Sequence, residues 1–247
     1  ELFFDILKER AETGRIYIMN IDHSNDHSSF KDRILMSNLC QEITLPTDPI
    51  QHIDGEGEIA LCILSAINVG KIDKRDELEP LCDLAVRALD EIIDHQKYPI
   101  VAAEVSTKAR RSLGIGYIGL AHYLAKKGYK YNHKLAWRQV DKLTEAFQFY
   151  LLSASMEVAK EKGKCDYFDR TKYSDGILPI DTYKKDVDEL VKRELTYDWE
   201  WLRKEIKKHG LRHSTLSAQM PSESSSIVSN ATNGIEPPRD YLSIKKS

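Results

Sequence analysis

The feature that most constrains the fold is an apolar run, "GEIALCILSAINVGKI", at residues 57–72. A run of this kind, too apolar for a surface position, is typical of a buried strand. The following segment, "DELEPLCDLAVRALDEIIDHQ", is typical of an amphipathic helix, because apolar residues recur at helical intervals: Leu78, Leu81, Ala85, Leu89 and Ile92. A buried strand followed by such a helix predicts an α/β fold.

The rest of the chain adds mainly helices. The pattern predicts helices over residues 1–14, over 134–163 with Gly163 as the stop, and near 181–193 and 198–209. Short strands are expected at 15–22 and at 34–46, where Pro46 closes the run. After Gly210 the composition is that of a loop. No internal repeat and no linker divides the chain, so one helix-rich α/β unit is expected.

Composition narrows the class of protein. The chain has 247 residues, 41% hydrophobic composition and a formal net charge of -3, which gives no bulk attraction to nucleic acid or anionic lipid. No apolar run approaches the length of about 20 residues that a membrane span needs. Nothing resembles a secretory signal, so a cytoplasmic protein without nucleic-acid or membrane partners is expected.

The four cysteines lack the C-x-x-C spacing of a zinc site and are expected to be reduced thiols, with no metal bound. Cys82, on the apolar side of a helix, and Cys165 are expected to be ordinary core residues. Cys62 lies in the apolar run of residues 57–72, where simple core packing is also the first interpretation. Cys40 lies among polar residues and requires a separate explanation.

Cys40 belongs to "SNLCQEITLPT", residues 37–47. If this stretch is a strand, Asn38, Cys40 and Glu42 point to the same face. A thiol that reacts, a carboxylate that takes a hydroxyl proton and an amide that holds oxygens would together suit a polyol or a sugar. The alternative is a polar strand face turned to solvent, because three residues at this spacing also occur by chance.

A second polar stretch, "PSESSS" at residues 221–226, follows Pro221. Small hydroxyl residues at the start of a helix can offer backbone N–H groups and side-chain O–H groups to a phosphate. The alternative is a helix N-cap in a polar loop, which is the more common use of such residues.

Three other motifs favour structural roles. "GIGYIG", with Gly114, Gly116 and Gly119, has the G-x-G-x-x-G spacing but lacks the preceding strand of a dinucleotide site, so close helix packing is expected. The basic "KARR" of residues 108–111 is expected to be a solvated face. The histidine pairs His23/His27 and His209/His213 lack a helix that would align them on a metal, and surface positions are expected.

The quoted segments, together with "LGIGYIGLAHYLAKKG", "GILPIDTYKKD" and "YDWEWLRKEIKKHGLRHSTLSA", resemble the large, catalytic subunit of class I ribonucleotide reductase, in order and across the whole chain. The resemblance implies a ten-stranded α/β barrel of two five-stranded parallel halves, with a radical cysteine on a central finger loop. A full-length large subunit is far longer than this chain. Residues 1–247 are therefore expected to be a partial catalytic barrel domain, without the N-terminal regulatory region and the C-terminal tail.

The resemblance also implies roles for single residues. Cys40 would become a transient thiyl radical that removes the 3′-hydrogen of a ribonucleotide, and Glu42 would take the 3′-hydroxyl proton. Asn38 would hold the substrate, and Cys62 would be one of two thiols that reduce it and end as a disulfide. The substrate-binding residues would be Asn38, Glu42, Ser37, Ser222, Glu223, Ser224 and Ser225, the last four at the phosphates.

The implied activity is the reduction of ribonucleoside diphosphates to 2′-deoxyribonucleoside diphosphates, which supplies DNA precursors. No cofactor would bind this chain: a metal-containing small subunit would supply the radical, and thioredoxin or glutaredoxin would be the reductant. The other segments of the large subunit would be required, so the chain alone is expected to be inactive. Two alternatives stay open, a related thiyl-radical reductase of the anaerobic type and an inactive fragment that serves as a scaffold.

Overall fold

The computed structural model describes residues 1–52, 55, 57–192, 194–240 and 242, and in this part of the chain helices predominate. The elements in chain order are α1 (Leu2–Thr13), α2 (Ile21–His27), β1 (Ile63–Asn68), η1 (Val69–Lys71), η2 (Arg75–Glu77), α3 (Leu78–His95), α4 (Val101–Arg110), β2 (Leu113–Ile118), α5 (Leu120–Lys126), α6 (Lys134–Lys162), η3 (Phe168–Arg170), η4 (Lys172–Asp175), α7 (Pro179–Thr182), α8 (Val187–Leu190), α9 (Trp199–His209) and α10 (Glu223–Val228). The prediction of a helix-rich α/β fold is confirmed.

The two strands form a parallel pair. Their register runs from Ile63 opposite Leu113 to Asn68 opposite Ile118, and every residue of β2 is buried. Residues 215–218 continue the pairing on the other edge of β2: the Ile115 amide donates to the Leu216 carbonyl at 2.9 Å, and Ile115 and Ser217 form a parallel bridge. Within the described residues no barrel closes, so the ten-stranded barrel remains a prediction.

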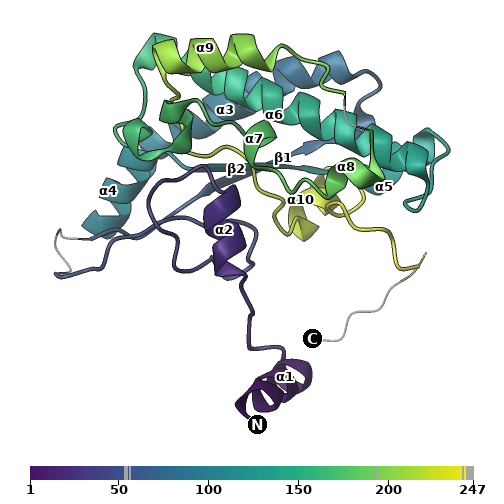
Figure 1. Cartoon of the computed structure of the whole chain (residues 1–247), viewed down its shortest axis with the longest axis horizontal. Coiled ribbons are helices and arrows are strands. Elements are labelled where there is room, and N and C mark those ends of the chain that lie inside the picture. Colours follow the sequence, from purple (N-terminus) through teal and green to yellow (C-terminus); the bar gives the residue numbers. More distant parts are fainter. Residues whose placement is uncertain (53–54, 56, 193, 241, 243–247) are drawn as a thin grey trace.

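The helices α3, α6 and α9 lie on one side of the strands, whereas α2 and α10 lie on the other (Figure 1). The main core fills the space between α3, α6, α9 and the strands, and it includes Leu89, Leu113, Leu143, Phe147 and Leu202. On α3 the buried stripe is Leu78, Cys82, Val86, Leu89 and Ile93, whereas Leu81 and Ile92 are exposed. The candidate site lies on the other side of the strands.

The strong helical patterns are confirmed as α1, α3, α6 and α9. The helix predicted near 181–193 is instead two single turns, α7 and α8, and residue 193 lies outside the described residues. The strand predicted at 15–22 is wrong: residues 15–20 form no strand, and Ile21 already begins α2. The strand predicted at 34–46 is also wrong, and its actual conformation is described with the site.

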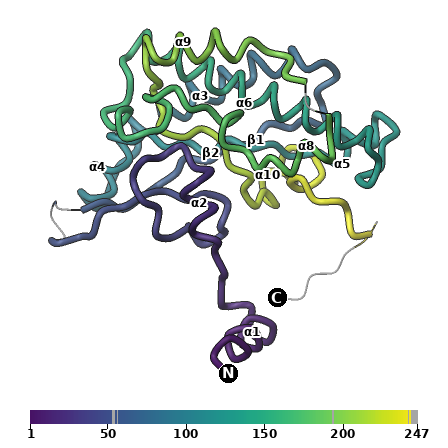
Figure 2. Tube along the Cα trace, in the orientation of Figure 1, coloured from purple at the N-terminus to yellow at the C-terminus, as the bar shows by residue number. Residues whose placement is uncertain are grey.

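Helix α1 lies apart from the rest of the molecule (Figures 1 and 2). None of its residues is buried, and Leu2, Phe3 and Phe4 are 74%, 65% and 71% exposed. The helix still ends as predicted, with Gly14 in the left-handed conformation. Helical periodicity therefore predicted this element correctly, although no contact within the described chain buries its apolar face.

The glycines of "GIGYIG" have a different role from the one predicted. Gly114 and Gly116 lie in β2 itself, so they do not serve helix packing. A Cβ atom on Gly116 would lie 2.4 Å from the carbonyl oxygen of Ala218, so glycine allows residues 217–220 to cross the strand closely. This crossing leads directly into the serine-rich stretch at 221–226.

The two arginines of "KARR" and one histidine are buried, which contradicts the predicted surface positions. Arg110 and Arg111 are 2% and 3% exposed, and His213 is fully buried. Arg111 pairs with Asp90 and Asp94, and His213 contacts Asp90 through Nε2 at 3.2 Å. A local sequence pattern could not show these partners, because they come from distant parts of the chain.

Candidate active site

Cys40 lies at the tip of a closed turn, residues 38–43, here called the Cys40 turn. The Asn38 amide donates to the Ile43 carbonyl at 3.4 Å, and the Ile43 amide donates to Asn38 Oδ1 at 3.4 Å. Gln41 has a positive φ of 58°, which reverses the chain direction after Cys40. The side chain of Asn38 thus replaces a strand partner, and Asn38, Cys40 and Glu42 do not share a strand face as predicted.

The Cys40 turn stands on a small apolar cluster that is separate from the main core. Ile34 and Ile43, which flank the turn, are buried with Phe30, Leu45 and Ala218. Cys62 is partly buried and packs against the same cluster. The Cys40 turn and Cys62 therefore pack against the same apolar cluster, although Cys40 and Cys62 are 22 residues apart in the sequence (62 − 40).

A cavity of about 350 Å³ separates the tip of the turn from the start of α10. Cys40, Gln41 and Glu42 line one side, and the other side is formed by Gln219, Met220, Pro221, Glu223, Asn233, Gly234, Ile235 and Glu236. The structure therefore brings Cys40 and Glu42 to the same cavity as Glu223. Cys40 is exposed at the tip, where a ligand or a partner can reach its thiol.

A second cavity, of about 380 Å³, lies on the other side of the turn and brings together Ser37, Asn38 and Cys62. Burial raises the pKa of the Cys62 thiol, and the negative charge of nearby Glu42 raises it further. Cys62 consequently keeps its proton at neutral pH. Glu42 therefore lines the first cavity and acts electrostatically on a residue of the second.

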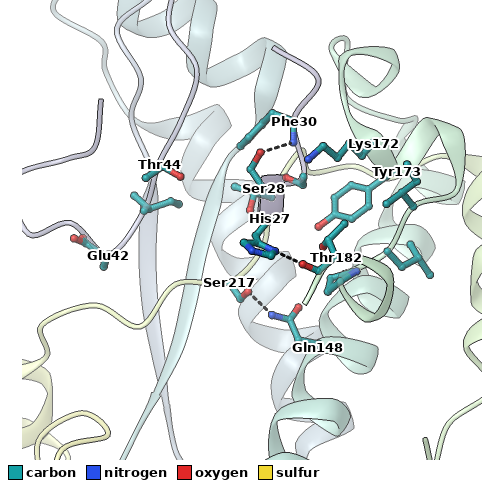
Figure 3. Close-up of a pocket in the computed structure, with 16 residues that line it drawn as sticks. His27, Ser28, Phe30, Glu42, Thr44, Gln148, Lys172, Tyr173, Thr182 and Ser217 are labelled. Carbon is teal, nitrogen blue, oxygen red and sulfur yellow. Dashed lines mark hydrogen bonds between the residues drawn. The ribbon is translucent and has the colours of Figure 1, made fainter. Parts of the chain in front are cut away.

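Glu42 is half-buried, and its Oε2 atom is buried without a hydrogen-bond donor among the described residues. Figure 3 shows Glu42 across a third cavity, of about 230 Å³, from the pairs His27–Thr182 and Gln148–Ser217, whose polar groups bond to each other. A buried carboxylate oxygen without a donor is unfavourable unless water or a ligand donates to it. The Glu42 Oε2 atom is thus an acceptor that water or a ligand hydroxyl can occupy.

The serine-rich stretch forms the start of α10, and its residues differ in role. Ser222 is 2% exposed; its Oγ atom donates to Asn233 Oδ1 at 2.9 Å and accepts from the Gly234 amide at 3.1 Å. The Ser225 hydroxyl donates to the Ser222 carbonyl at 3.3 Å, and Ser224 and Ser225 are exposed. Ser222 therefore braces the loop at residues 233–234, whereas Glu223, Ser224 and Ser225 lie at the surface.

Sequence reasoning missed the second wall of the cavity. Gln219, Asn233 and Gly234 line it together with Cys40, yet none was singled out. The "NATNG" sequence at 230–234 is a turn signal, because Asn and Gly favour turns, but nothing in it indicates which residues the turn meets. Contacts with distant segments hold this loop opposite the Cys40 turn, among them the hydrogen bond from the Gly119 amide to the Thr232 carbonyl at 2.9 Å.

Two kinds of feature are absent from the part of the chain that the structure describes. In that part of the chain, no group of three or more His, Cys, Asp or Glu side chains could hold a metal ion. None of the described helices is long and apolar enough to cross a membrane.

The family model described as "Ribonucleotide reductase, barrel domain" covers residues 1–247, so the chain belongs to the ribonucleotide reductase family. The recognition of the class I large subunit from sequence is confirmed, and the matched region is the barrel domain.

The relatives identify the subunit. Over its whole length the chain is 60% identical to "Ribonucleoside-diphosphate reductase subunit alpha" of Haemophilus influenzae and 59% identical to "Ribonucleoside-diphosphate reductase 1 subunit alpha" of Escherichia coli. It is 43% identical to the alpha subunit of enterobacteria phage T4. The chain spans 33% of the length of each of these three proteins. It therefore corresponds to about one third of an alpha subunit.

Proposed function

We propose that this chain is a segment of the catalytic subunit of a class I ribonucleoside-diphosphate reductase, and that it supplies part of the centre that reduces ribonucleoside diphosphates to 2′-deoxyribonucleoside diphosphates. The product would be a DNA precursor made in the cytoplasm. The observation that carries the proposal is the cavity shared by Cys40, Glu42 and Glu223, which has a thiol, a carboxylate and the start of the serine-rich helix around one space.

Cys40 starts the reaction. The metal-containing small subunit supplies the oxidising equivalent that removes the hydrogen atom from the Cys40 thiol. The sulfur radical then takes the 3′-hydrogen of the ribose, so an S–H bond forms, the C3′–H bond breaks and the radical moves to carbon. The position of Cys40 at an exposed tip supports this role, because the reacting sulfur must be accessible before substrate covers it.

Glu42 accepts the proton of the 3′-hydroxyl. Its buried Oε2 atom has no donor among the described residues, so a substrate hydroxyl can occupy that acceptor. Ser37 and Asn38 line the second cavity, on the other side of the Cys40 turn, and they would hold a substrate that spans both cavities. Because Asn38 Oδ1 already accepts from the Ile43 amide, the Asn38 Nδ2 group is the part of the amide that would contact the substrate oxygens.

Cys62 supplies reducing equivalents. The 2′-hydroxyl leaves as water, the substrate gains two electrons, and Cys62 and a second cysteine from another segment of the subunit lose them and form a disulfide. The raised pKa of Cys62 supports this role, because the thiol retains the hydrogen that must be delivered. Thioredoxin or glutaredoxin would afterwards reduce the disulfide.

The start of α10 would bind the diphosphate. The amides of a first helical turn lack acceptors within the helix, and the hydroxyls of Ser224 and Ser225 lie beside them at the surface. Ser222 would act indirectly, by bracing the loop. Glu223, a carboxylate on the cavity wall, is better suited to a ribose hydroxyl than to a phosphate, because two negative groups repel each other.

The remaining segments of the alpha subunit would complete the barrel around β1 and β2, and the isolated chain would not turn over. The test is to mix this chain with polypeptides that supply the rest of the subunit, a class I small subunit and dithiothreitol, and to measure deoxyribonucleoside diphosphate. Cys40→Ser and Glu42→Ala should each abolish product, whereas Cys82→Ala, a thiol buried in the main core, should not. Assembly of all parts without product would contradict the proposal and favour a scaffold role.

A further inference from the structure

The largest of the fully buried side chains among the described residues is charged. Arg110, the last residue of α4, is 2% exposed. Its Nη1 atom lies 2.9 Å from Asp32 Oδ2, and its Nη2 and Nε atoms lie 2.8 and 3.2 Å from Glu58 Oε2. None of these three residues lines the cavity that contains Cys40, and although Glu58 lines the second cavity with Asn38 and Cys62, the proposed chemistry gives none of the three a role.

The two carboxylates occupy special positions in the chain. Asp32 immediately precedes, and Glu58 immediately follows, the stretch of residues 33–57 that contains the Cys40 turn. A single guanidinium thus holds both ends of that stretch. We call Asp32, Arg110 and Glu58 the clasp.

The clasp is attached to the body of the molecule on the arginine side. The Arg110 carbonyl accepts from the Ser214 amide at 3.0 Å, and the Ala109 carbonyl accepts from the Tyr167 amide at 3.1 Å. The Ile59 amide also donates to the Ala102 carbonyl at 3.2 Å, which fixes the end of the stretch along α4. The clasp is therefore fixed to α4, and the end of α4 is hydrogen-bonded to Tyr167 and Ser214.

A second arginine supports the same carboxylates. Arg170 Nε lies 2.7 Å from Asp32 Oδ2, and Arg170 Nη1 lies 3.8 Å from Glu58 Oε1. The ring of Tyr167 makes a cation–π contact with each arginine: its centroid lies 5.0 Å from Arg110 Cζ and 4.3 Å from Arg170 Cζ. Each acidic end of the stretch is therefore held from two directions.

Physical chemistry indicates what such an arrangement contributes. A buried ion pair adds little net stability over an apolar packing of the same volume, because both charges lose their hydration. A guanidinium that bonds carboxylates has strict geometry, however, whereas an apolar cluster tolerates sliding. Beneath the Cys40 turn the apolar cluster is small, so directional bonds are required to fix where the turn lies.

We propose that Arg110 is a positioning residue: through Asp32 and Glu58 it sets the position of the Cys40 turn relative to the start of α10. The structural part of this inference stands on the contacts alone. Its catalytic consequence rests on the proposed function, because it assumes that Cys40 must meet a substrate bound at α10.

Ala218 contacts both sides of the cavity, because it belongs to the apolar cluster beneath the Cys40 turn and to the crossing over Gly116. The hydrogen bonds of Ser222 to Asn233 and Gly234, which hold the α10 side, do not involve the clasp. Loss of the clasp should therefore displace Cys40 from the reacting carbon, together with Ser37, Asn38 and Glu42 on the same stretch, whereas the diphosphate contacts at α10 remain in place. A displacement of about 1 Å can lower a rate about 100-fold, so kcat should fall by a much larger factor than KM rises.

The structural part can be tested on this chain by hydrogen–deuterium exchange of a peptide covering residues 31–46, whose amides Lys31, Ile34 and Ile43 are hydrogen-bonded. Arg110→Met and Asp32→Asn should each accelerate that exchange about tenfold or more. The matched control is Arg212→Met, which removes an arginine from the separate network at Asp90 and should leave the peptide unchanged. If Arg110→Met does not fold, Asp32→Asn decides alone.

Unchanged exchange in the clasp variants, or equal acceleration in the Arg212→Met control, would overturn the proposal. The catalytic part is measured in the assembled reductase, where Arg110→Met should lower kcat by a much larger factor than it raises KM, and Arg110→Lys, which can hold one carboxylate, should restore part of kcat. An equal loss in KM would contradict a positioning role. If the unsubstituted assembly makes no product, the proposed function fails, while the exchange result still decides the clasp.

Discussion

The four cysteines differ in solvent exposure and in thiol pKa according to their position in the fold. Cys40 is exposed at the tip of its turn, and Cys62 is half-buried beside a carboxylate. Burial raises the pKa of both Cys82 and Cys165 to about 12, as expected for the core positions predicted from sequence. Helical periodicity predicted the burial of Cys82, but core packing was the first interpretation of Cys62 from sequence as well, and Cys165 lies beyond the end of α6. Sequence could not show that Glu42 influences Cys62.

The influence of Glu42 on Cys62 can be measured directly. Replacement of Glu42 by Gln removes a negative charge, which should lower the pKa of Cys62 and increase its thiolate fraction. Alkylation of Cys62 by iodoacetamide at pH 8 should become about two- to tenfold faster, because a pKa lower by up to about one unit increases the thiolate fraction by up to about tenfold. The rate is followed by mass spectrometry of the two reactive cysteines, with Cys40 as the reference. An unchanged ratio of the two rates would show that the carboxylate does not act on Cys62.

At the scale of elements, the sequence predicted those that depend on local pattern and failed where a partner segment decides. Helices α3, α6 and α9 follow from their own periodicity. The strand expected at 34–46 rested on length and on Pro46, but a strand needs a neighbour, and here the Asn38 side chain closes a turn instead. The glycine motif was misjudged for the same reason, because the segment that crosses Gly116 comes from about 100 residues later in the chain.

The close crossing of residues 217–220 over Gly116 can be tested by a matched pair of glycine-to-alanine substitutions. In Gly116→Ala the new methyl group would meet the Ala218 carbonyl at 2.4 Å, and backbone cannot move aside without breaking its hydrogen bonds to Ile115. The free energy of unfolding should fall by about 1–3 kcal/mol. In Gly114→Ala, on the same strand, the nearest atom is Leu64 Cδ2, the end of a flexible side chain, so the loss should be smaller. Urea unfolding of both variants measures the difference, and equal losses would refute the close crossing.

At the scale of the whole molecule, two buried charge networks join segments that are far apart in sequence. Arg110 and Arg111 are neighbours at the end of α4, yet Arg110 binds Asp32 and Glu58 whereas Arg111 binds Asp90 and Asp94. The "KARR" motif was predicted to be a solvated face because net charge and local pattern do not reveal partners at a distance. The arrangement of the layers is thus partly fixed by contacts that no local pattern encodes.

The network at Asp90 also makes stability depend on pH. Burial lowers the pKa of His213, and the charges of Arg111 and Arg212 oppose protonation, although Asp90 favours it. Burial alone would raise the pKa of Asp90, but the hydrogen bond from His213 and the neighbouring arginines outweigh it and hold this pKa below its usual range. His213 is therefore neutral at pH 7; its Nε2–H donates to Asp90, and its Nδ1 accepts from the Ser155 hydroxyl at 2.9 Å.

Both shifts act in the same direction on the free energy of unfolding. A group whose pKa is lower in the folded chain binds protons more readily when unfolded, so its contribution is complete above the unfolded pKa and is lost as pH falls through the folded pKa. Stability should thus begin to decrease below about pH 6.5 because of His213, with a further decrease below about pH 4 because of Asp90. His213→Gln should flatten the slope between pH 6.5 and 5, which for one proton is at most about 1.4 kcal/mol per pH unit. Urea unfolding at several pH values tests this, with the exposed His95→Gln as the control; an identical slope in all three proteins would place the acid sensitivity elsewhere.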